Sequence, residues 1–80
     1  MKVQVVVVPK GGVLDPQGKA IASALTRLGY SAVHDVRAGK VFRMEIDAES
    51  ALEAKDLAAK MAETLLANPV IEDFEVEVLK

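Results

Sequence analysis

The order in which hydrophobic periodicity changes along this chain restricts its fold more than any other feature. Val3, Val5 and Val7 alternate with other residues before Pro9, and this period of two is typical of a strand with one buried face. The end of the same segment, as far as Val8, is apolar on both faces. We therefore expect the first element to be a central strand, or a strand whose second face is covered by another subunit.

A helix should follow this strand. Asp15 can cap the free amides of a first turn, and the fixed φ of Pro16 suits the first helical position. Four apolar residues then recur at the spacing of one helical face: Ile21, Ala24, Leu25 and Leu28. Gly29 can adopt the left-handed conformation with which helices commonly end. The sequence therefore predicts a helix between Asp15 and Gly29.

Residues 30–37 and 40–47 are predicted to be two strands of a hairpin. The turn between them would lie at Ala38 and Gly39, where glycine can take the positive φ that tight turns need. Three apolar residues of the later strand share one face: Phe42, Met44 and Ile46. The earlier strand has an ambiguous pattern, so we expect it at an edge of the sheet or at an interface.

A second helix is predicted over residues 50–67. Ser50 and Glu53 have the spacing of a capping box, and Asn68 precedes Pro69, which disfavours further helix. The predicted core-facing residues are Ala54, Leu57, Ala58, Met61 and Leu65. Two leucines lie off this face and are candidates for contact with another chain: Leu52 and Leu66.

The last segment has the pattern of a strand with one buried and one acidic face. Phe74, Val76 and Val78 alternate there with Asp73, Glu75 and Glu77. The elements then follow the order βαββαβ within a single domain, residues 1–80. With right-handed crossovers this order predicts an α+β, ferredoxin-like fold, in which two helices cover one face of a four-stranded antiparallel sheet. The opposite face would expose Val6, Val8 and Val41, so we expect the chains to associate into dimers through the sheet.

Composition also favours association. A chain of 80 residues has a thin core, and this one has no cysteine and a single histidine, so it lacks disulfides and thiolate metal sites as stabilisers. We expect a homodimer or a dimer of dimers. No apolar run is long enough for a membrane span and no leader pattern precedes the first strand, which together favour a soluble, cytoplasmic protein.

The charge is unevenly distributed. Residues 1–44 hold seven basic and two acidic residues, and residues 45–80 hold three basic and ten acidic ones. The basic residues are dispersed and have no aromatic neighbours that could stack on bases, so we do not expect nucleic acid as a partner. The alternatives are two solvated faces of opposite sign, or a surface that meets a copy of itself or a partner of complementary potential.

The residues that carry chemistry form no recognisable catalytic or metal-binding set. His34 has no cysteine or serine in a nucleophile setting beside it, and one imidazole with dispersed carboxylates lacks the spacing of metal ligands. Lys10, Gly11 and Gly12 match neither common phosphate-binding glycine motif. We therefore predict no catalytic, metal or cofactor site in this chain. The candidate partner contacts are exposed residues at turns and helix ends: Lys10, Gln17, Arg37, Lys40 and Asn68.

Four blocks of sequence resemble one family. They are residues 12–18, which open the first helix, residues 28–30, which close it, residues 36–40 at the predicted hairpin, and residues 65–72 before the last strand. In this order and spacing they resemble the PurS family, the small subunit of phosphoribosylformylglycinamidine synthase. The resemblance covers essentially the whole chain.

The resemblance implies a non-catalytic role in a complex. The synthase converts formylglycinamide ribonucleotide, ATP and glutamine to formylglycinamidine ribonucleotide in purine biosynthesis. In the split form of the enzyme, a PurL-like large subunit uses ATP and Mg²⁺, a PurQ-like glutaminase releases ammonia, and PurS dimers join the two. Two other classes share the topology, namely ligand-sensing modules of the ACT type and acylphosphatases. The second requires an arginine in the loop after the first strand, where this chain has Lys10, Gly11 and Gly12.

Overall fold

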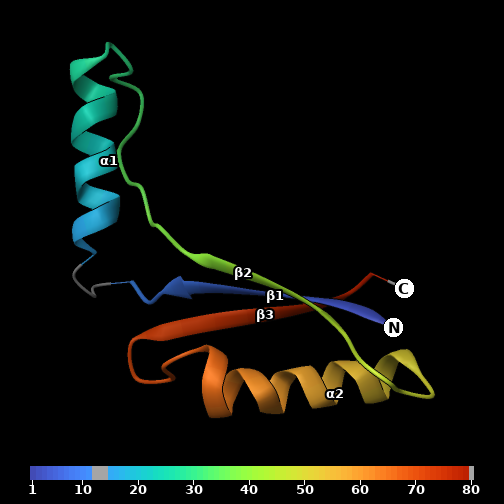
Figure 1. Ribbon diagram of the computed structural model, residues 1–80. Helices are drawn as coiled ribbons and strands as arrows, with labels where there is room; N and C mark the ends of the chain where they lie inside the picture. Colours follow the sequence, from blue (N-terminus) through green and yellow to red (C-terminus); the bar gives the residue numbers. More distant parts are fainter. Residues whose placement is uncertain (12–14, 80) are drawn as a thin grey trace.

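The computed structural model describes residues 1–11 and 15–79, and within them three strands form one antiparallel sheet in the order β2-β1-β3 (Figure 1). The strands are β1 (Lys2–Pro9), β2 (Lys40–Glu45) and β3 (Glu72–Val78). The helices are α1 (Pro16–Arg27) and α2 (Ala51–Met61), and α2 continues into a π-helical turn, η1 (Ala62–Leu66). This architecture confirms the α+β, ferredoxin-like class. The predicted contributions of Gly12, of residues 13 and 14, and of Lys80 lie outside the described residues.

The core lies between the sheet and α2. Val3, Val5 and Val7 of the central strand are completely buried, as the alternation predicted. Their neighbours across β2 and β3 extend the same face, since Val5 lies opposite Phe42 on one side and Val76 on the other. Three alanines of α2 and η1 are also fully buried: Ala54, Ala58 and Ala62. Because the alanine side chain ends at Cβ, the helix lies close to the strands.

The second helix begins as predicted and ends differently. Ser50 Oγ accepts a hydrogen bond from the amide of Glu53 at 3.1 Å, which is the expected N-cap. At the other end the helix widens into the π turn η1. Leu66 there packs against the core, whereas Leu65 is 83% exposed. The prediction that Leu65 faces the core and Leu66 another chain was therefore wrong, because a π turn changes which side chain follows Ala62 on the buried face.

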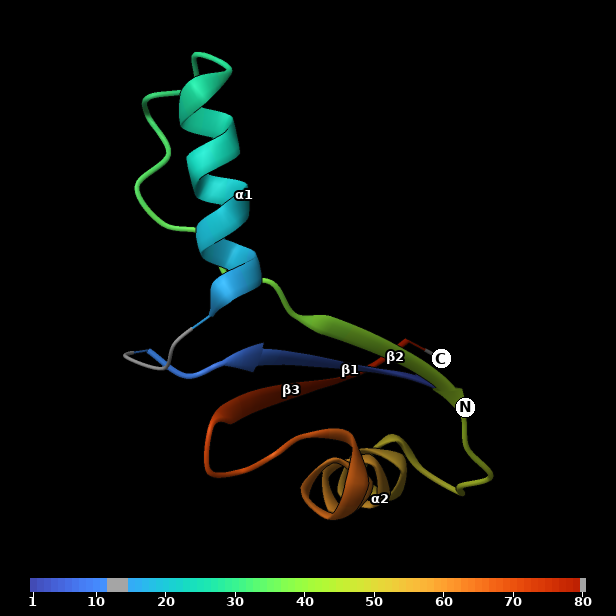
Figure 2. The same ribbon diagram turned by 60° about the vertical axis from the view of Figure 1, so that its left-hand side comes forward.

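The predicted strand over residues 30–37 is absent from the described structure, and no hairpin turn forms at Ala38 and Gly39. Residues 33–39 have no regular secondary structure and run back along α1 (Figures 1 and 2). Together with α1 they form an arm, residues 15–39. Gly39 has no positive φ, and it is needed for another reason: a Cβ there would collide with the carbonyl oxygen of Val7.

The arm projects from the sheet, so the expectation of both helices on one face was also wrong. Figure 1 shows α1 rising from one end of the sheet, on the side away from α2, and Figure 2 confirms this from a second direction. The radius of gyration is 15.6 Å, against roughly 12 Å for a compact domain of this length. The apolar stripe of α1 is therefore not used to cover the chain's own sheet.

Candidate interaction surfaces

The arm root, where residues 15–18 and 36–39 meet, is held by one carboxylate. Asp15 Oδ1 accepts a hydrogen bond from the amide of Gly18 at 3.0 Å, and Oδ2 accepts one from the amide of Ala38 at 2.9 Å. These amides, Gly18 first, hold the pKa of Asp15 below its ordinary value of 3.8, against a smaller opposing effect of desolvation. One charged side chain thus joins the start of α1 to the segment that returns to β2.

Close backbone contacts complete the arm root. Gly18 is buried, and a Cβ there would collide with the carbonyl oxygen of Val36 and the Asp15 carboxylate. Arg37 places its guanidinium over Gly11, and its Nε lies 3.4 Å from Asp35 Oδ2. The arm is therefore fixed where it leaves the sheet, and these contacts set its direction.

The tip of the arm is a complete Schellman motif. The amide of Tyr30 donates to the carbonyl of Leu25 at 2.9 Å, and the amide of Gly29 donates to that of Thr26 at 3.1 Å. Gly29 has a φ of 103°, as predicted for the residue that ends this helix. The tip exposes large side chains, with Leu28 73% and Tyr30 61% exposed. Ile21, on the same apolar stripe, is 39% exposed.

A shallow apolar hollow lies on the α2 side of the sheet. It has a volume of about 380 Å³ and is lined by Met44 of β2 and by residues at the end of α2 and in η1: Lys60, Met61, Thr64, Leu65 and Leu66. Met61 is 38% exposed there, and Phe42 and Met44 of β2 are half-buried. This surface and the α1 stripe are the two apolar regions whose placement the sequence did not predict.

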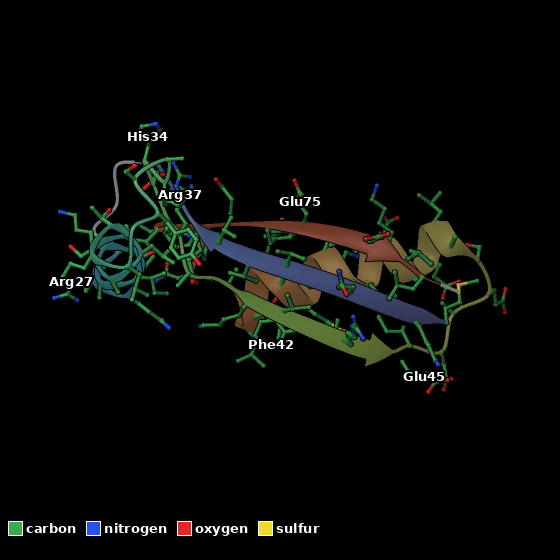
Figure 3. The ribbon with its side chains drawn as sticks, turned by 90° about the horizontal axis from the view of Figure 1, so that it is seen from above. Arg27, His34, Arg37, Phe42, Glu45 and Glu75 are labelled. Carbon is green, nitrogen blue, oxygen red and sulfur yellow. The ribbon has the colours of Figure 1, made fainter. Side chains whose placement is uncertain are left out.

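The open face of the sheet combines valine with charged residues. Val6 lies between Val41 and Glu75 on the neighbouring strands, and Val41 is 57% exposed. Beside them Arg43 Nε donates to Gln4 Oε1 at 3.1 Å. Figure 3 looks down on this face, with α2 behind the sheet. The expected open face with its valines and carboxylates is confirmed.

The five predicted contact residues gather at the arm end of the molecule. Lys10 follows β1 and Lys40 begins β2 opposite Val7, so both lie where the arm leaves the sheet. Arg37 lies in the returning segment (Figure 3), with its guanidinium near Gly11, which follows Lys10. Gln17 is exposed in the first turn of α1. Asn68 stands at the nearby turn before β3.

Asn68 has a structural role that its exposure did not reveal. Its Oδ1 accepts the amide of Val70 at 3.1 Å, and its own amide donates to Glu72 Oε1 at 2.8 Å. The same turn is tied to the end of β1, because the amide of Lys10 donates to the carbonyl of Ile71 at 2.8 Å. Asn68 therefore shapes the turn before β3, and Lys10 lies beside this turn, with its Nζ 4.0 Å from Asp73 Oδ1.

The described residues hold no group of three or more histidine, cysteine, aspartate or glutamate side chains placed to bind a metal ion. His34 is exposed on the arm (Figure 3). Among the helices of residues 1–11 and 15–79, none is long and apolar enough to cross a membrane.

Comparison with known proteins decides between the classes that share this topology. The family model PurS, phosphoribosylformylglycinamidine (FGAM) synthase, matches residues 2–80. The chain is 53% identical over 64 residues to phosphoribosylformylglycinamidine synthase subunit PurS of Mycobacterium leprae, covering 80% of this chain and 77% of that protein. The chain belongs to the PurS family.

Solved PurS structures share the whole fold. Bacillus subtilis PurS superposes with a TM-score of 0.82 at 45% identity, covering 99% of this chain and 98% of that one. A chain of PurLQS from Thermotoga maritima gives a TM-score of 0.85 at 34% identity, covering 95% and 93%. Because the arm is nearly a third of the chain, such scores require it to project in these PurS structures as it does here.

Proposed function

We propose that this chain is the non-catalytic assembly subunit of a phosphoribosylformylglycinamidine synthase, the glutamine-dependent ligase of purine biosynthesis. The observation that carries the proposal is the family match over residues 2–80, together with the likeness to a chain of PurLQS. In this role the chain joins a PurL-like synthetase to a PurQ-like glutaminase. The ACT-type alternative gains no support from any of the relatives, which are named as PurS subunits.

The chain's own residues suit this role. Glutaminase chemistry of the PurQ kind needs a cysteine nucleophile, and the sequence has no cysteine. The surfaces that remain are suited to protein contact: an arm with an apolar stripe, an apolar hollow, and a basic arm root. ATP and Mg²⁺ are assigned in this proposal to the large subunit, and the reaction to the cytoplasm.

A bridging subunit can raise product yield without taking part in the chemistry. Ammonia released at one active site must reach another, and in water it is protonated or lost by diffusion. Holding the two sites in register shortens that path and excludes solvent from it. We place the contacts with the larger subunits at the arm root, at Gln17 and Arg37, and beside it at Lys10, Lys40 and Asn68.

The proposal is tested by reconstituting the synthase from its large and glutaminase subunits, with and without this chain. Synthesis with glutamine should depend on its presence, whereas synthesis with high external ammonium should depend on it much less, because ammonium bypasses the glutaminase. The chain should also co-purify with both subunits, and alone it should hydrolyse no glutamine. Equal glutamine-dependent turnover with and without the chain would contradict the proposal.

A further inference from the structure

A shallow polar hollow, the arm hollow, lies between α1 and the beginning of the returning segment. It has a volume of about 450 Å³. Lys19, Ser23, Thr26 and Arg27 of α1 line one side of it, and His34 lines the other. All five residues are exposed, and Figure 3 shows Arg27 and His34 on the arm, clear of the sheet. The arm hollow is therefore open to a partner from solution.

The arm hollow lies on the face of α1 opposite the apolar stripe. Lys19, Ser23 and Thr26 follow one another at spacings of four and three residues, which keeps them on one side of the helix. Ile21 and Leu28 belong to the stripe on the other side. A ligand in the arm hollow therefore leaves the stripe free for a separate contact.

The charge of the arm hollow is positive and is not neutralised from within the chain. α1 carries Lys19 and Arg27 and no acidic residue, and neither of these cations forms an ion pair within the described part of the chain. The acids nearest in sequence are engaged elsewhere, because Asp15 accepts two backbone amides and Asp35 lies 3.4 Å from Arg37 Nε. Lys19 also lies in the first turn of α1, where the helix dipole disfavours a further cation. An anion in the arm hollow would relieve this.

We propose that the arm hollow binds an extended acidic segment of another protein, with Asp or Glu at two positions four residues apart. Lys19 and Arg27 are eight residues apart on α1, which separates their Cα atoms by about 12 Å along the helix. An extended segment returns to the same side at every second residue and covers about 13 Å in four residues. Two carboxylates at this spacing match the two cations. This site is separate from the contacts at the arm root, and its occupation does not depend on the proposed function.

The hydroxyl groups between the two cations suit the backbone of such a segment. Thr26 Oγ1 donates to the carbonyl of Ala22 at 3.1 Å, so its oxygen can still accept a hydrogen bond from an N–H group. The Ser23 hydroxyl, almost one turn earlier, can donate to a carbonyl group. Hydrogen bonds to the backbone would hold the segment in place, while the two ion pairs would select its sequence.

Titration of the full chain with a short synthetic peptide tests the proposal. The peptide carries two glutamates four positions apart and is otherwise uncharged, and it should shift the amide resonances of Ser23 and His34. Lys19→Ala with Arg27→Ala should weaken binding about three- to tenfold, because two exposed ion pairs are lost. Lys55→Ala with Lys60→Ala makes the same change of charge at exposed sites on α2, and this control should alter the affinity by less than about twofold. Equal affinity of the parent and the Lys19 and Arg27 double variant would overturn the proposal.

Two further ligands test the spacing of the charges and the kind of anion. A peptide with its glutamates three positions apart has them on opposite sides when extended, so it should bind about threefold more weakly or worse. Inorganic phosphate, at matched ionic strength, should displace the first peptide far less readily than unlabelled peptide does. If both peptides bind equally, or if phosphate competes as well as the peptide, the arm hollow is not a site for an acidic segment and the proposal fails.

Reversal of the charges checks that the effect belongs to these two side chains. Lys19→Glu with Arg27→Glu should no longer bind the glutamate peptide and should bind a peptide with lysines at the same two positions. The melting temperature should stay near that of the parent, since both side chains are exposed. A folded reversed variant that binds the glutamate peptide as the parent does would contradict the proposal.

Discussion

At the scale of single residues, Asp15 has the widest influence. As an N-cap it was predictable from sequence, because Pro16 and the helical stripe follow it directly. Its second hydrogen bond comes from Ala38, which is 23 positions away. No local pattern indicates such a contact, and yet it joins the returning segment to the start of α1.

The lowered pKa of Asp15 gives the arm root a defined pH dependence. A carboxylate whose folded pKa is depressed contributes stability above its unfolded value, near 3.8, and this stability is lost as pH falls through the folded pKa. The amide resonances of Gly18 and Ala38 should therefore shift together in acid, with a midpoint below 3.8. Asp15→Asn should lack this titration and should have a lower melting temperature at pH 7. A midpoint at or above 3.8 for the Ala38 amide would contradict the assignment.

Replacing Gly18 by alanine should change the stability in the direction opposite to that usual for a glycine inside a helix. Inside a helix, replacing glycine by alanine normally stabilises by up to about 1 kcal/mol. At Gly18 the added Cβ would meet the Val36 carbonyl and the Asp15 carboxylate, so Gly18→Ala should destabilise by about 1–3 kcal/mol. Urea unfolding measures the difference, and Ser23→Ala in the same helix, which should change stability by less than about 0.5 kcal/mol, is the control. A more stable Gly18→Ala variant would show that the arm root is looser than described.

At the scale of elements, a helix or strand could be predicted from the sequence where its signals lie within its own residues. β1, α1, α2 and β3 were found because each carries its own period and its own end signals, such as the Ser50 cap and the Gly29 terminus. The strand predicted over residues 30–37 is absent, because a strand needs a neighbour, and no feature within those residues says whether one is available. The same holds for the stripe of α1: its apolar pattern predicts burial, but nothing within the helix says which surface it would contact, and Ile21 and Leu28 are exposed in this chain.

The close approach of α2 to the sheet can be tested at Ala58, which is completely buried. Ala58→Leu should destabilise by about 1–3 kcal/mol, because the extra atoms must push the helix away from β1 and β3. Ala51→Leu is the matched control in the exposed first turn of the same helix, with an expected change of less than about 0.5 kcal/mol. Thermal unfolding of both variants at equal chain concentration measures the effect. Similar melting temperatures for the two would mean that α2 lies farther from the sheet.

At the scale of the whole molecule, basic and acidic residues lie in different regions of the surface. The positive residues Lys10, Arg37 and Lys40 lie where the arm leaves the sheet, and the carboxylates of β3 lie on the open sheet face with Val6 and Val41. The arm end therefore suits an acidic partner surface. The open face suits another sheet with basic residues, which is consistent with the expected association of chains through the sheet.

Reversing two charges at the arm root tests its role in the synthase complex. Arg37→Glu with Lys40→Glu should leave the chain folded and weaken complex formation roughly three- to tenfold, since each exposed pair contributes modestly. Glutamine-dependent turnover should then fall more than ammonium-dependent turnover, and the deficit should shrink as salt is raised.

Lys2→Glu with Lys55→Glu, which changes net charge equally at exposed sites away from the arm root, is the control for that experiment. The complex should tolerate it with little loss of affinity. Parental glutamine-dependent activity of the Arg37 and Lys40 double variant, at subunit concentrations near the dissociation constant, would place the contacts elsewhere on the chain.

Residues 33–39, which pair with no strand, also affect the fate of chains that are made in excess of their partner subunits. Proteases bind their substrates as extended strands, and this segment already has an irregular backbone and lies outside the sheet. A copy without neighbours offers it freely, whereas a partner bound at the proposed contacts around the arm root would restrict access to it. Degradation would then remove surplus copies first. Degradation of unassembled copies would thereby keep the abundance of this chain close to that of its partners.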